Sequence, residues 1–305
     1  MSELKIQNKV VQSLIREENP FPSIFEYLTT EIWEPQEDIT SYYEQDEDAK
    51  HFERFLQDTY FELYTEELPK HCSGSLQADL DHQTLILLDM LSLREGVLLK
   101  EHLRNNGYSV DLDYSFSAMP STTKAFKKKI NLQKKRKAHK YKKINDFQGF
   151  SLDGDENFIW SSFPDEWLEE IQKGKKIRTT EEEVYQKTLT HLKEILAQLE
   201  DDEEIVLTSD HGYNVAKGAY QFSLDARDQK KIKEVMGNSR SIQNTNVEAD
   251  KLVDAGFLVE YDEYLMAQSR NIWPIRGSYS VYQHGGASLL ECMIPKLTIK
   301  NGDTV

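Results

Sequence analysis

Apolar positions change their spacing along the chain, and the first change separates an N-terminal segment from the rest. Over residues 1–70 apolar side chains recur every three or four positions, as at Phe52, Phe55 and Leu56, which predicts helices. Three prolines divide this run into short helices, and a segment at residues 69–75 that holds Pro69 and Gly74 ends it. We therefore expect a helical N-terminal appendage over residues 1–75.

Beyond residue 76, short and continuous apolar runs replace the helical spacing. The expected strands cover residues 84–88, 108–114, 158–162, 205–208, 279–282 and 297–299. Helices are expected between them, over residues 95–105 and from Thr180 onward. This alternation predicts an α/β fold over residues 76–305, with a mostly parallel central sheet that carries helices on both faces.

A long polar stretch at residues 213–275 interrupts the alternation. It is too long to be a structureless loop inside a compact domain. We interpret it as a lid or cap insertion with its own helices at residues 226–236 and 247–255.

Composition narrows the class of protein. The 305 residues carry a net charge of −16, which argues against a general nucleic-acid binder. With only Cys72 and Cys292 we expect neither a disulfide framework nor a cysteine-based zinc site. No apolar run approaches the roughly 20 residues of a membrane span, and the first residues lack the apolar core of a secretory signal. We expect a cytoplasmic protein that does not enter a membrane.

The charge is unevenly distributed. Residues 1–70 hold 17 acidic and 6 basic residues, whereas residues 124–143 hold 11 Lys or Arg and no acid. A locally positive strip on an acidic protein favours one anionic ligand held at one place. The alternative is a solvated, disordered lysine-rich loop.

Polar side chains follow several of the predicted strands at the point where each strand ends. In a parallel sheet the ligand site lies beyond these carboxyl ends. The residues found there are Asp89, Asp165, Asp210, His211 and His284, together with the hydroxyl cluster of residues 121–123. Each one alone is as compatible with a helix cap or a turn. Together they offer oxygen and nitrogen ligands that suit Zn²⁺ or Mn²⁺, beside a hydroxyl nucleophile. This set of residues is typical of a two-metal site for phosphoryl transfer.

The segments that contain these residues resemble the PglZ domain, a family of the alkaline phosphatase superfamily. The resemblance runs from about residue 84 to 300 and excludes the helical N-terminus. It rests on Leu-Leu-Asp at residues 87–89, Met-Pro-Ser-Thr-Thr at 119–123, Leu-Thr-Ser-Asp-His-Gly at 207–212 and His-Gly-Gly-Ala-Ser-Leu-Leu-Glu at 284–291. The third and fourth segments are the specific ones.

The resemblance implies two divalent metal ions and a threonine nucleophile. The residues that match the ligands of the first metal are Asp89, Thr123, Asp210 and His211. Thr123 also matches the nucleophile, with Thr122 as the alternative. Zn²⁺ is the expected metal, and Mn²⁺ or Mg²⁺ are the alternatives at the second site.

The second metal is implied less completely. His284 and Asp165 match two of its ligands, but Glu169 stands where the superfamily has a histidine. This departure allows a carboxylate-rich second site, a weak one or a displaced ligand, for which Asp153, Asp155 and His191 are the other candidates. The same resemblance places four basic residues against substrate phosphates: Lys124, Lys127, Lys128 and Arg276.

The implied activity is that of a metal-dependent phosphodiesterase or nuclease-type hydrolase that cleaves a nucleotide or oligonucleotide phosphodiester. Antiphage defence or nucleotide signalling is the implied setting. The alternatives are a phosphomonoesterase of the same superfamily and a non-catalytic domain that binds a nucleotide or a partner. Residues 1–75 are the expected surface for a protein partner in a defence complex, with solubilising decoration as the alternative.

Overall fold

The computed structural model describes residues 8–75, 79–172, 179–199, 204–215, 222–223, 225–244, 249–272 and 282–301. The chain divides into two compact units. Residues 73–213 and 290–305 form one, here called the sheet unit, and residues 1–72 and 214–289 form the other, here called the composite unit. Each is described separately below.

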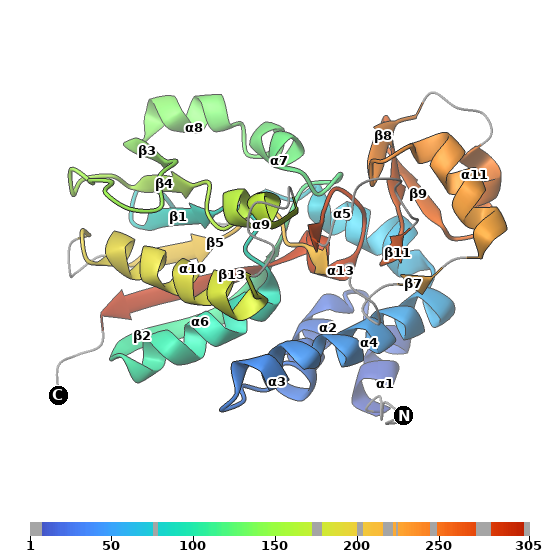
Figure 1. Ribbon diagram of the computed structural model, residues 1–305, viewed down its shortest axis with the longest axis horizontal. Helices are drawn as coiled ribbons and strands as arrows, with labels where there is room; N and C mark the ends of the chain where they lie inside the picture. Colours follow the sequence, from blue (N-terminus) through green and yellow to red (C-terminus); the bar gives the residue numbers. More distant parts are fainter. Residues whose placement is uncertain are drawn as a thin grey trace. The chain divides into compact units, whose positions relative to one another are not determined.

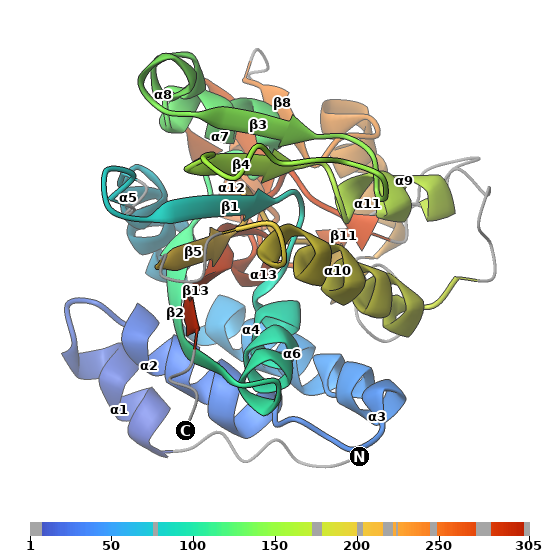
Figure 2. The ribbon, with the colours of Figure 1, turned by 90° about the vertical axis from the view of Figure 1, so that its left-hand side faces the viewer.

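A six-stranded sheet forms the centre of the sheet unit (Figure 2). In spatial order its strands are β2 (Tyr108–Phe116), β13 (Met293–Asn301), β5 (Ile205–Thr208), β1 (Thr84–Leu88), β4 (Phe158–Ser161) and β3 (Tyr141–Ile144). β1 pairs in parallel with β4 and β5, and β3 pairs in parallel with β4. Only β13 runs antiparallel to both of its neighbours. The predicted α/β class with a mostly parallel central sheet is confirmed.

Helices cover both faces of this sheet, which explains why β1 is buried throughout. Leu85 and Leu87 pack in one buried cluster with Ile294 of β13 and Phe126 of α7. Side chains alternate along a strand, so Pro295 points to the opposite face. On that face a Cβ at Gly96 of α6 would lie 2.6 Å from the side chain of Pro295. α6 and α7 therefore lie on opposite faces of the sheet.

The helices of the sheet unit are α6 (Leu93–Asn105), α7 (Thr123–Lys129), α8 (Leu132–Ala138), α9 (Asp165–Gln172) and α10 (Glu181–Leu196), and α13 (Leu289–Cys292) leads into β13. Thr180 caps α10, because its side chain accepts a hydrogen bond from the Glu183 N–H at 3.2 Å. Gly107 follows α6 with φ +89°, a conformation that glycine adopts without strain.

One strand prediction needs correction. Tyr282, the last residue of the strand predicted at 279–282, belongs to β12 (Tyr282–Gln283), which pairs with β6 (Asn214–Val215) and not with the central sheet. Residues 279–281 lie outside the described residues. The distal lysine-rich segment is not a disordered loop. It forms α8 and then β3, where Tyr141 and Ile144 pair with β4 and anchor two lysines at the sheet edge.

The composite unit joins the N-terminal helices to the inserted segment. Its helices are α1 (Asn8–Arg16), α2 (Phe21–Tyr27), α3 (Ile39–Glu44), α4 (Asp46–Thr59), α5 (Leu68–Cys72), α11 (Ala226–Met236) and α12 (Asp250–Asp254), with π-helical turns at Leu28–Ile32 and Leu63–Glu67. Its strands are β6 with β12, β7 (Phe222–Ser223) with β11 (Asn271–Ile272), and the antiparallel set β8 (Ser241–Gln243), β10 (Tyr264–Ala267) and β9 (Leu258–Tyr261).

A small apolar core lies between α11, α12 and the antiparallel strands. Figure 1 labels α11, β8 and β9 of this part of the chain. Ile232, Met236 and Leu252 pack there against Leu258 and Leu265. α11 occupies residues 226–236 as the apolar spacing predicts, and α12 falls within the second predicted helix. The role of residues 213–275 as a lid stays a prediction.

A buried ion-pair network ties α4 to the segment after β10. The Arg270 guanidinium lies 3.0 Å from Glu53 Oε2 and 3.3 Å from Asp46 Oδ2, and all three side chains are buried. Glu53 also accepts a hydrogen bond from the Leu289 N–H at 2.7 Å. These charges compensate one another inside the composite unit. None of the described helices has the combined length and apolar character needed to cross a bilayer.

Candidate metal centre

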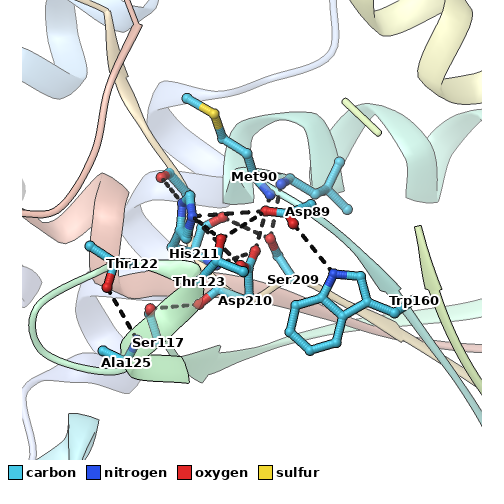
Figure 3. A network of polar contacts seen from close by, with 12 residues as sticks. Asp89, Met90, Ser117, Thr122, Thr123, Ala125, Trp160, Ser209, Asp210 and His211 are labelled. Carbon is cyan, nitrogen blue, oxygen red and sulfur yellow. Dashed lines mark hydrogen bonds and ion pairs between the residues drawn. The ribbon is translucent and has the colours of Figure 1, made fainter. Parts of the chain in front are cut away.

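Two neighbouring parallel strands bring three potential metal ligands together at their carboxyl ends (Figure 3). Asp89 follows β1 directly, and Asp210 and His211 follow β5. One ligand atom from each of these side chains lies within 4.8 Å of those of the other two. All three residues are buried. The register of β1 against β5 therefore builds the cluster that the strand-end pattern predicts.

The backbone holds the His211 ring in one orientation. Its Nδ1 lies 3.0 Å from the Gly212 carbonyl oxygen, which can only accept, so Nδ1 carries the proton. The Nε2 lone pair then faces the carboxylates, 3.6 Å from Asp210 Oδ2 and 3.9 Å from Asp89 Oδ1. A neutral imidazole with its second nitrogen fixed by a carbonyl is the usual form of a metal-ligating histidine.

Backbone donors fix one oxygen of Asp210. Its Oδ1 accepts hydrogen bonds from the Met90 N–H at 3.1 Å and the His211 N–H at 3.0 Å. Ser209 secures the same turn, since its Oγ accepts from the Leu91 N–H and donates to the His211 carbonyl oxygen. The other oxygen of Asp210, Oδ2, is buried and has no hydrogen-bond partner within the described ranges. One oxygen is thus positioned by the chain, and the other is directed into the cluster.

Gly212 is required where the chain leaves the cluster. A Cβ at this position would lie 2.0 Å from the Leu290 carbonyl oxygen, closer than any side chain permits. The Gly212 N–H donates to the Glu291 carbonyl oxygen at 3.0 Å. This close approach explains the glycine that follows Asp210 and His211 in the sequence.

The two adjacent threonines have different surroundings. The Thr123 hydroxyl lies 3.3 Å from Asp89 Oδ1 and 3.2 Å from His211 Nε2. Thr122 is the N-cap of α7, and its hydroxyl accepts a hydrogen bond from the Ala125 N–H at 3.2 Å. The Thr123 hydroxyl therefore lies at the cluster, whereas the Thr122 hydroxyl caps the helix.

Burial makes the carboxyl groups of the site reluctant to ionise. It raises the pKa of Asp89 to about 8, helped by the charge of Asp210, and it raises the pKa of Asp165 to about 7, helped by the charge of Asp89. Burial also raises the pKa of Asp210. Among the described residues no Lys or Arg forms an ion pair with Asp89 or Asp210. Buried carboxylates without a cation are costly, and a divalent ion would supply the missing charge.

The donor set fits a divalent metal ion. It combines carboxylate oxygens with one imidazole nitrogen, which suits Zn²⁺ and Mn²⁺. The Oδ2 atom of Asp210, which has no hydrogen-bond partner within the described residues, and the Nε2 lone pair of His211 both point into the cluster, where such an ion would bind. The structure therefore holds a candidate metal site at Asp89, Asp210 and His211, next to Thr123.

The residues predicted for a second metal come from both units. Asp165 begins α9, and its Oδ1 is buried without a hydrogen-bond partner in the described part of the chain. Glu169 lies one turn later on α9 and is exposed, and its charge contributes to the raised pKa of Asp165. His284 follows β12 in the composite unit. Their role as ligands stays a prediction.

The other ligand candidates have structural contacts. His191 is buried, with Nε2 2.8 Å from Ser161 Oγ and Nδ1 3.0 Å from the Phe147 carbonyl oxygen. Asp155 forms an ion pair with Lys140. The Asp153 N–H donates to Glu156 Oε1 at 2.9 Å. These side-chain contacts account for His191 and Asp155 without a metal, whereas the contact of Asp153 involves only its backbone N–H.

Of the four predicted substrate-binding residues, two line one pocket. Lys127 and Lys128 face a cavity between α7, α8 and β3, whereas Lys124 is exposed on α7 and is not part of its lining. Arg276 lies outside the described residues.

The sequence interpretation missed Trp160. Its indole Nε1 donates to Asp89 Oδ2 at 3.3 Å, so it fixes the oxygen that Thr123 does not contact. Trp160 lies inside a predicted strand, whereas the strand-end pattern indicates only polar residues that follow a strand. A tryptophan in a buried strand needs an acceptor for its N–H, which is the signal that could have found it.

A family model described as "BREX system PglZ alkaline phosphatase-like domain" matches residues 153–299, slightly less than half of the chain. The resemblance to the PglZ family is confirmed over this range. The matched range contains Asp165, Asp210, His211 and His284, whereas Asp89 and Thr123 precede it. No curated protein matches the chain. The family match indicates a hydrolase of the phosphoesterase type.

Proposed function

We propose that the chain is a metal-dependent phosphodiesterase that cleaves a nucleotide or oligonucleotide phosphodiester, with Thr123 as its nucleophile. The observation that carries the proposal is the position of the Thr123 hydroxyl, 3.3 Å from Asp89 Oδ1 and 3.2 Å from His211 Nε2, at the edge of the three-ligand cluster. The match to an alkaline phosphatase-like family supports the reaction class.

Thr123 has a route for losing its proton. The Asp89 carboxylate oxygen Oδ1 lies 3.3 Å from the Thr123 hydroxyl and can accept its proton, while the Nε2 lone pair of His211 is kept for the metal ion. Divalent ions held by Asp89, Asp210 and His211 would supply the positive charge that stabilises a threonine alkoxide and the charge that develops on the phosphate.

The reaction then follows as two displacements at phosphorus. The Thr123 oxygen forms a bond to phosphorus while the bond to the leaving alcohol breaks, and that alcohol takes up a proton. Water next attacks the phosphothreonine and releases the Thr123 hydroxyl and the phosphate monoester. Trp160 and the backbone N–H groups of Met90 and His211 hold the carboxylates of Asp89 and Asp210 throughout.

The setting of this activity is also a proposal. The description of the matched family places it in the BREX system. We propose that the chain serves antiphage defence and that residues 1–75 dock a protein partner. The acidic surplus of residues 1–70 supports a basic partner surface.

The test compares hydrolysis of bis-p-nitrophenyl phosphate and p-nitrophenyl phosphate with Zn²⁺ and with Mn²⁺. We expect metal-dependent cleavage of the diester, reduced at least about 100-fold in Thr123→Ala. Thr122→Ser is the matched control, because serine caps a helix as well as threonine does. Preferred cleavage of the monoester would identify a phosphomonoesterase instead. No turnover of either ester by metal-loaded protein would identify a binding domain.

A further inference from the structure

A pocket of about 560 Å³ lies between α7, α8 and β3 of the sheet unit. Pockets that hold small ligands span roughly 300–1,000 Å³, so this one has room for a nucleotide. The lining residues that matter here are Lys127, Lys128, Leu132, Arg136, Tyr141 and Lys143. They come from one continuous stretch of the chain, in which α7, α8 and the edge strand β3 follow one another.

The pocket is positively charged on an acidic protein. Four of its lining side chains are cations, and no Asp or Glu lines it, while the whole chain carries a net charge of −16. Lys128, Arg136 and Lys143 are exposed to solvent at its surface. The positive charges of the pocket attract a polyanion, while the negative charge of the rest of the protein repels it.

One wall is flat and aromatic. The Arg136 guanidinium lies over the Tyr141 ring, 4.6 Å from its centroid, and the Tyr141 ring packs edge-on against Phe158 at 5.1 Å. Leu132 adds apolar surface beside them. Stacked guanidinium and aromatic planes with an apolar neighbour suit a nucleobase, which stacks on such surfaces whatever its identity. A pocket for phosphate alone would not need this wall.

The pocket is connected to the candidate metal centre through its innermost cation. The Lys127 ammonium lies 5.1 Å from the centre of the Trp160 ring, and Trp160 donates to Asp89. Lys127 is also one turn beyond Thr123 on α7, which is about 6 Å along a helix axis. That is about the length of one backbone unit of a nucleic-acid strand.

We propose that this pocket holds one nucleotide of a single-stranded nucleic acid, next to the phosphodiester that faces Thr123. Its base stacks at Tyr141 and Arg136, and its phosphates contact Lys127, Lys128 and Lys143. Single-stranded nucleic acid is then the substrate of the proposed function. Cleavage of the bound strand rests on that function, whereas binding of the strand does not.

Binding is tested without turnover, with a short fluorescent oligothymidylate in EDTA, by fluorescence anisotropy over a series of salt concentrations. The pocket variant is Lys127→Gln/Lys143→Gln. The control is Lys134→Gln/Lys137→Gln, which removes the same charge from exposed positions of α8 outside the lining. We expect the pocket variant to bind at least about tenfold more weakly and to lower the salt slope by about 1.4, since each contact to a single strand contributes about 0.7.

The control variant should change the dissociation constant less than about twofold, because its lysines lie outside the pocket. Equal losses in both variants, or no measurable binding by the unmodified protein at low salt, would overturn the proposal. Because EDTA prevents hydrolysis, this result stands whatever the diester assay shows, and an inactive enzyme that binds would separate the two proposals.

A second probe tests the base contact. An abasic deoxyribose-phosphate strand of the same length carries the same charge and has nothing to stack. We expect it to bind at least about fivefold more weakly than oligothymidylate, because stacking on an aromatic wall is lost. Equal binding of the two strands would contradict the nucleotide assignment.

Discussion

Adjacent residues with the same side chain can have separate tasks, as Thr122 and Thr123 do. Thr122 faces the first turn of α7 and caps it, while Thr123 faces Asp89 and His211. Thr122→Ala should lower the free energy of unfolding by about 1 kcal/mol, because the Ala125 N–H loses its acceptor. Thr123→Ala should leave stability nearly unchanged and remove diester hydrolysis.

Urea unfolding and diester turnover, measured on both variants, check this division of roles. The account expects the two effects to fall on different residues. If Thr122→Ala abolished turnover while Thr123→Ala retained it, the assignment of the nucleophile would be wrong.

The raised pKa values at the metal centre predict how stability depends on pH in the absence of metal. Asp89 titrates near 3.8 when unfolded and at about 8 when folded, and Asp165 near 3.8 and at about 7. At pH values between the unfolded and the folded pKa of each group, the folded protein keeps the proton on that carboxyl group and the unfolded chain has lost it. The free energy of unfolding therefore falls as pH rises, by about 1.4 kcal/mol per pH unit for each group.

Urea unfolding in EDTA at about pH 5 and about pH 7.5 measures this slope. Asp89→Asn removes one of these titrating carboxyl groups, so the stability profile of the variant should be flatter than that of the unmodified protein. Superimposable profiles would show that Asp89 does not carry the effect.

For single residues, the sequence indicates the candidate metal ligands better than it indicates the groups that hydrogen-bond those ligands. Asp210 and His211 follow a clear apolar strand and fall in a recognisable segment. The groups that hold the carboxylates in place are the Trp160 indole and the Met90 N–H, which lie 50 or more positions away in the sequence from Asp210. Only the register of β1 against its neighbours brings them to the site.

Among the elements, α4 and the segment after β10 depend on one another through the network of Arg270, Asp46 and Glu53. Arg270→Ala would leave two buried carboxylates without their cation. We expect the free energy of unfolding of the composite unit to fall by about 3–5 kcal/mol. Thermal or urea unfolding measures the loss.

A surface substitution provides the comparison. Lys230 lies on α11 and forms an exposed pair with Glu234 at 3.9 Å, so Lys230→Ala should cost less than about 1 kcal/mol. If Arg270→Ala were equally mild, the buried network would not hold α4 to the inserted segment, and the composite unit would need another explanation.

The elements differ in how far the sequence determines them. The apolar run of β1 and the helical spacing of α11 depend on local pattern alone, and both follow the prediction. β3 is not predicted because its two lysines interrupt the apolar pattern of a strand, and the strand forms by pairing with β4. The antiparallel set β8, β9 and β10 is not predicted because its strands have only three or four residues each, too few for a clear apolar pattern.

For the whole molecule, the division into two units gives residues 1–72 a structural partner in residues 214–289. The periodicity of either segment cannot reveal this, because the contacts join positions more than 200 apart, as between Glu53 and Arg270. We propose that the N-terminal helices and the insertion act together. Deleting residues 1–72 should then make residues 214–289 susceptible to limited proteolysis while the central sheet stays protected. Equal protection of both regions would contradict this.

Metal binding links the site to the stability of the whole sheet unit. An ion that binds the folded chain alone raises the free energy of unfolding by about 2.7 kcal/mol at a concentration 100 times its dissociation constant. Zn²⁺ or Mn²⁺ should therefore raise the melting temperature near neutral pH, and EDTA should reverse the gain. Asp210→Asn should lose most of this response, while Asp155→Asn, at an exposed position, should keep it.

The central claim is that Asp89, Asp210 and His211 hold a divalent metal ion beside Thr123. Anomalous diffraction at the zinc edge, from crystals grown with Zn²⁺, tests it most directly, because it locates the ion without depending on activity. The account predicts a peak within coordination distance of His211 Nε2 and of both carboxylates, adjacent to the Thr123 hydroxyl. A zinc-containing crystal with no peak at this cluster, or with its peak elsewhere, would contradict the account.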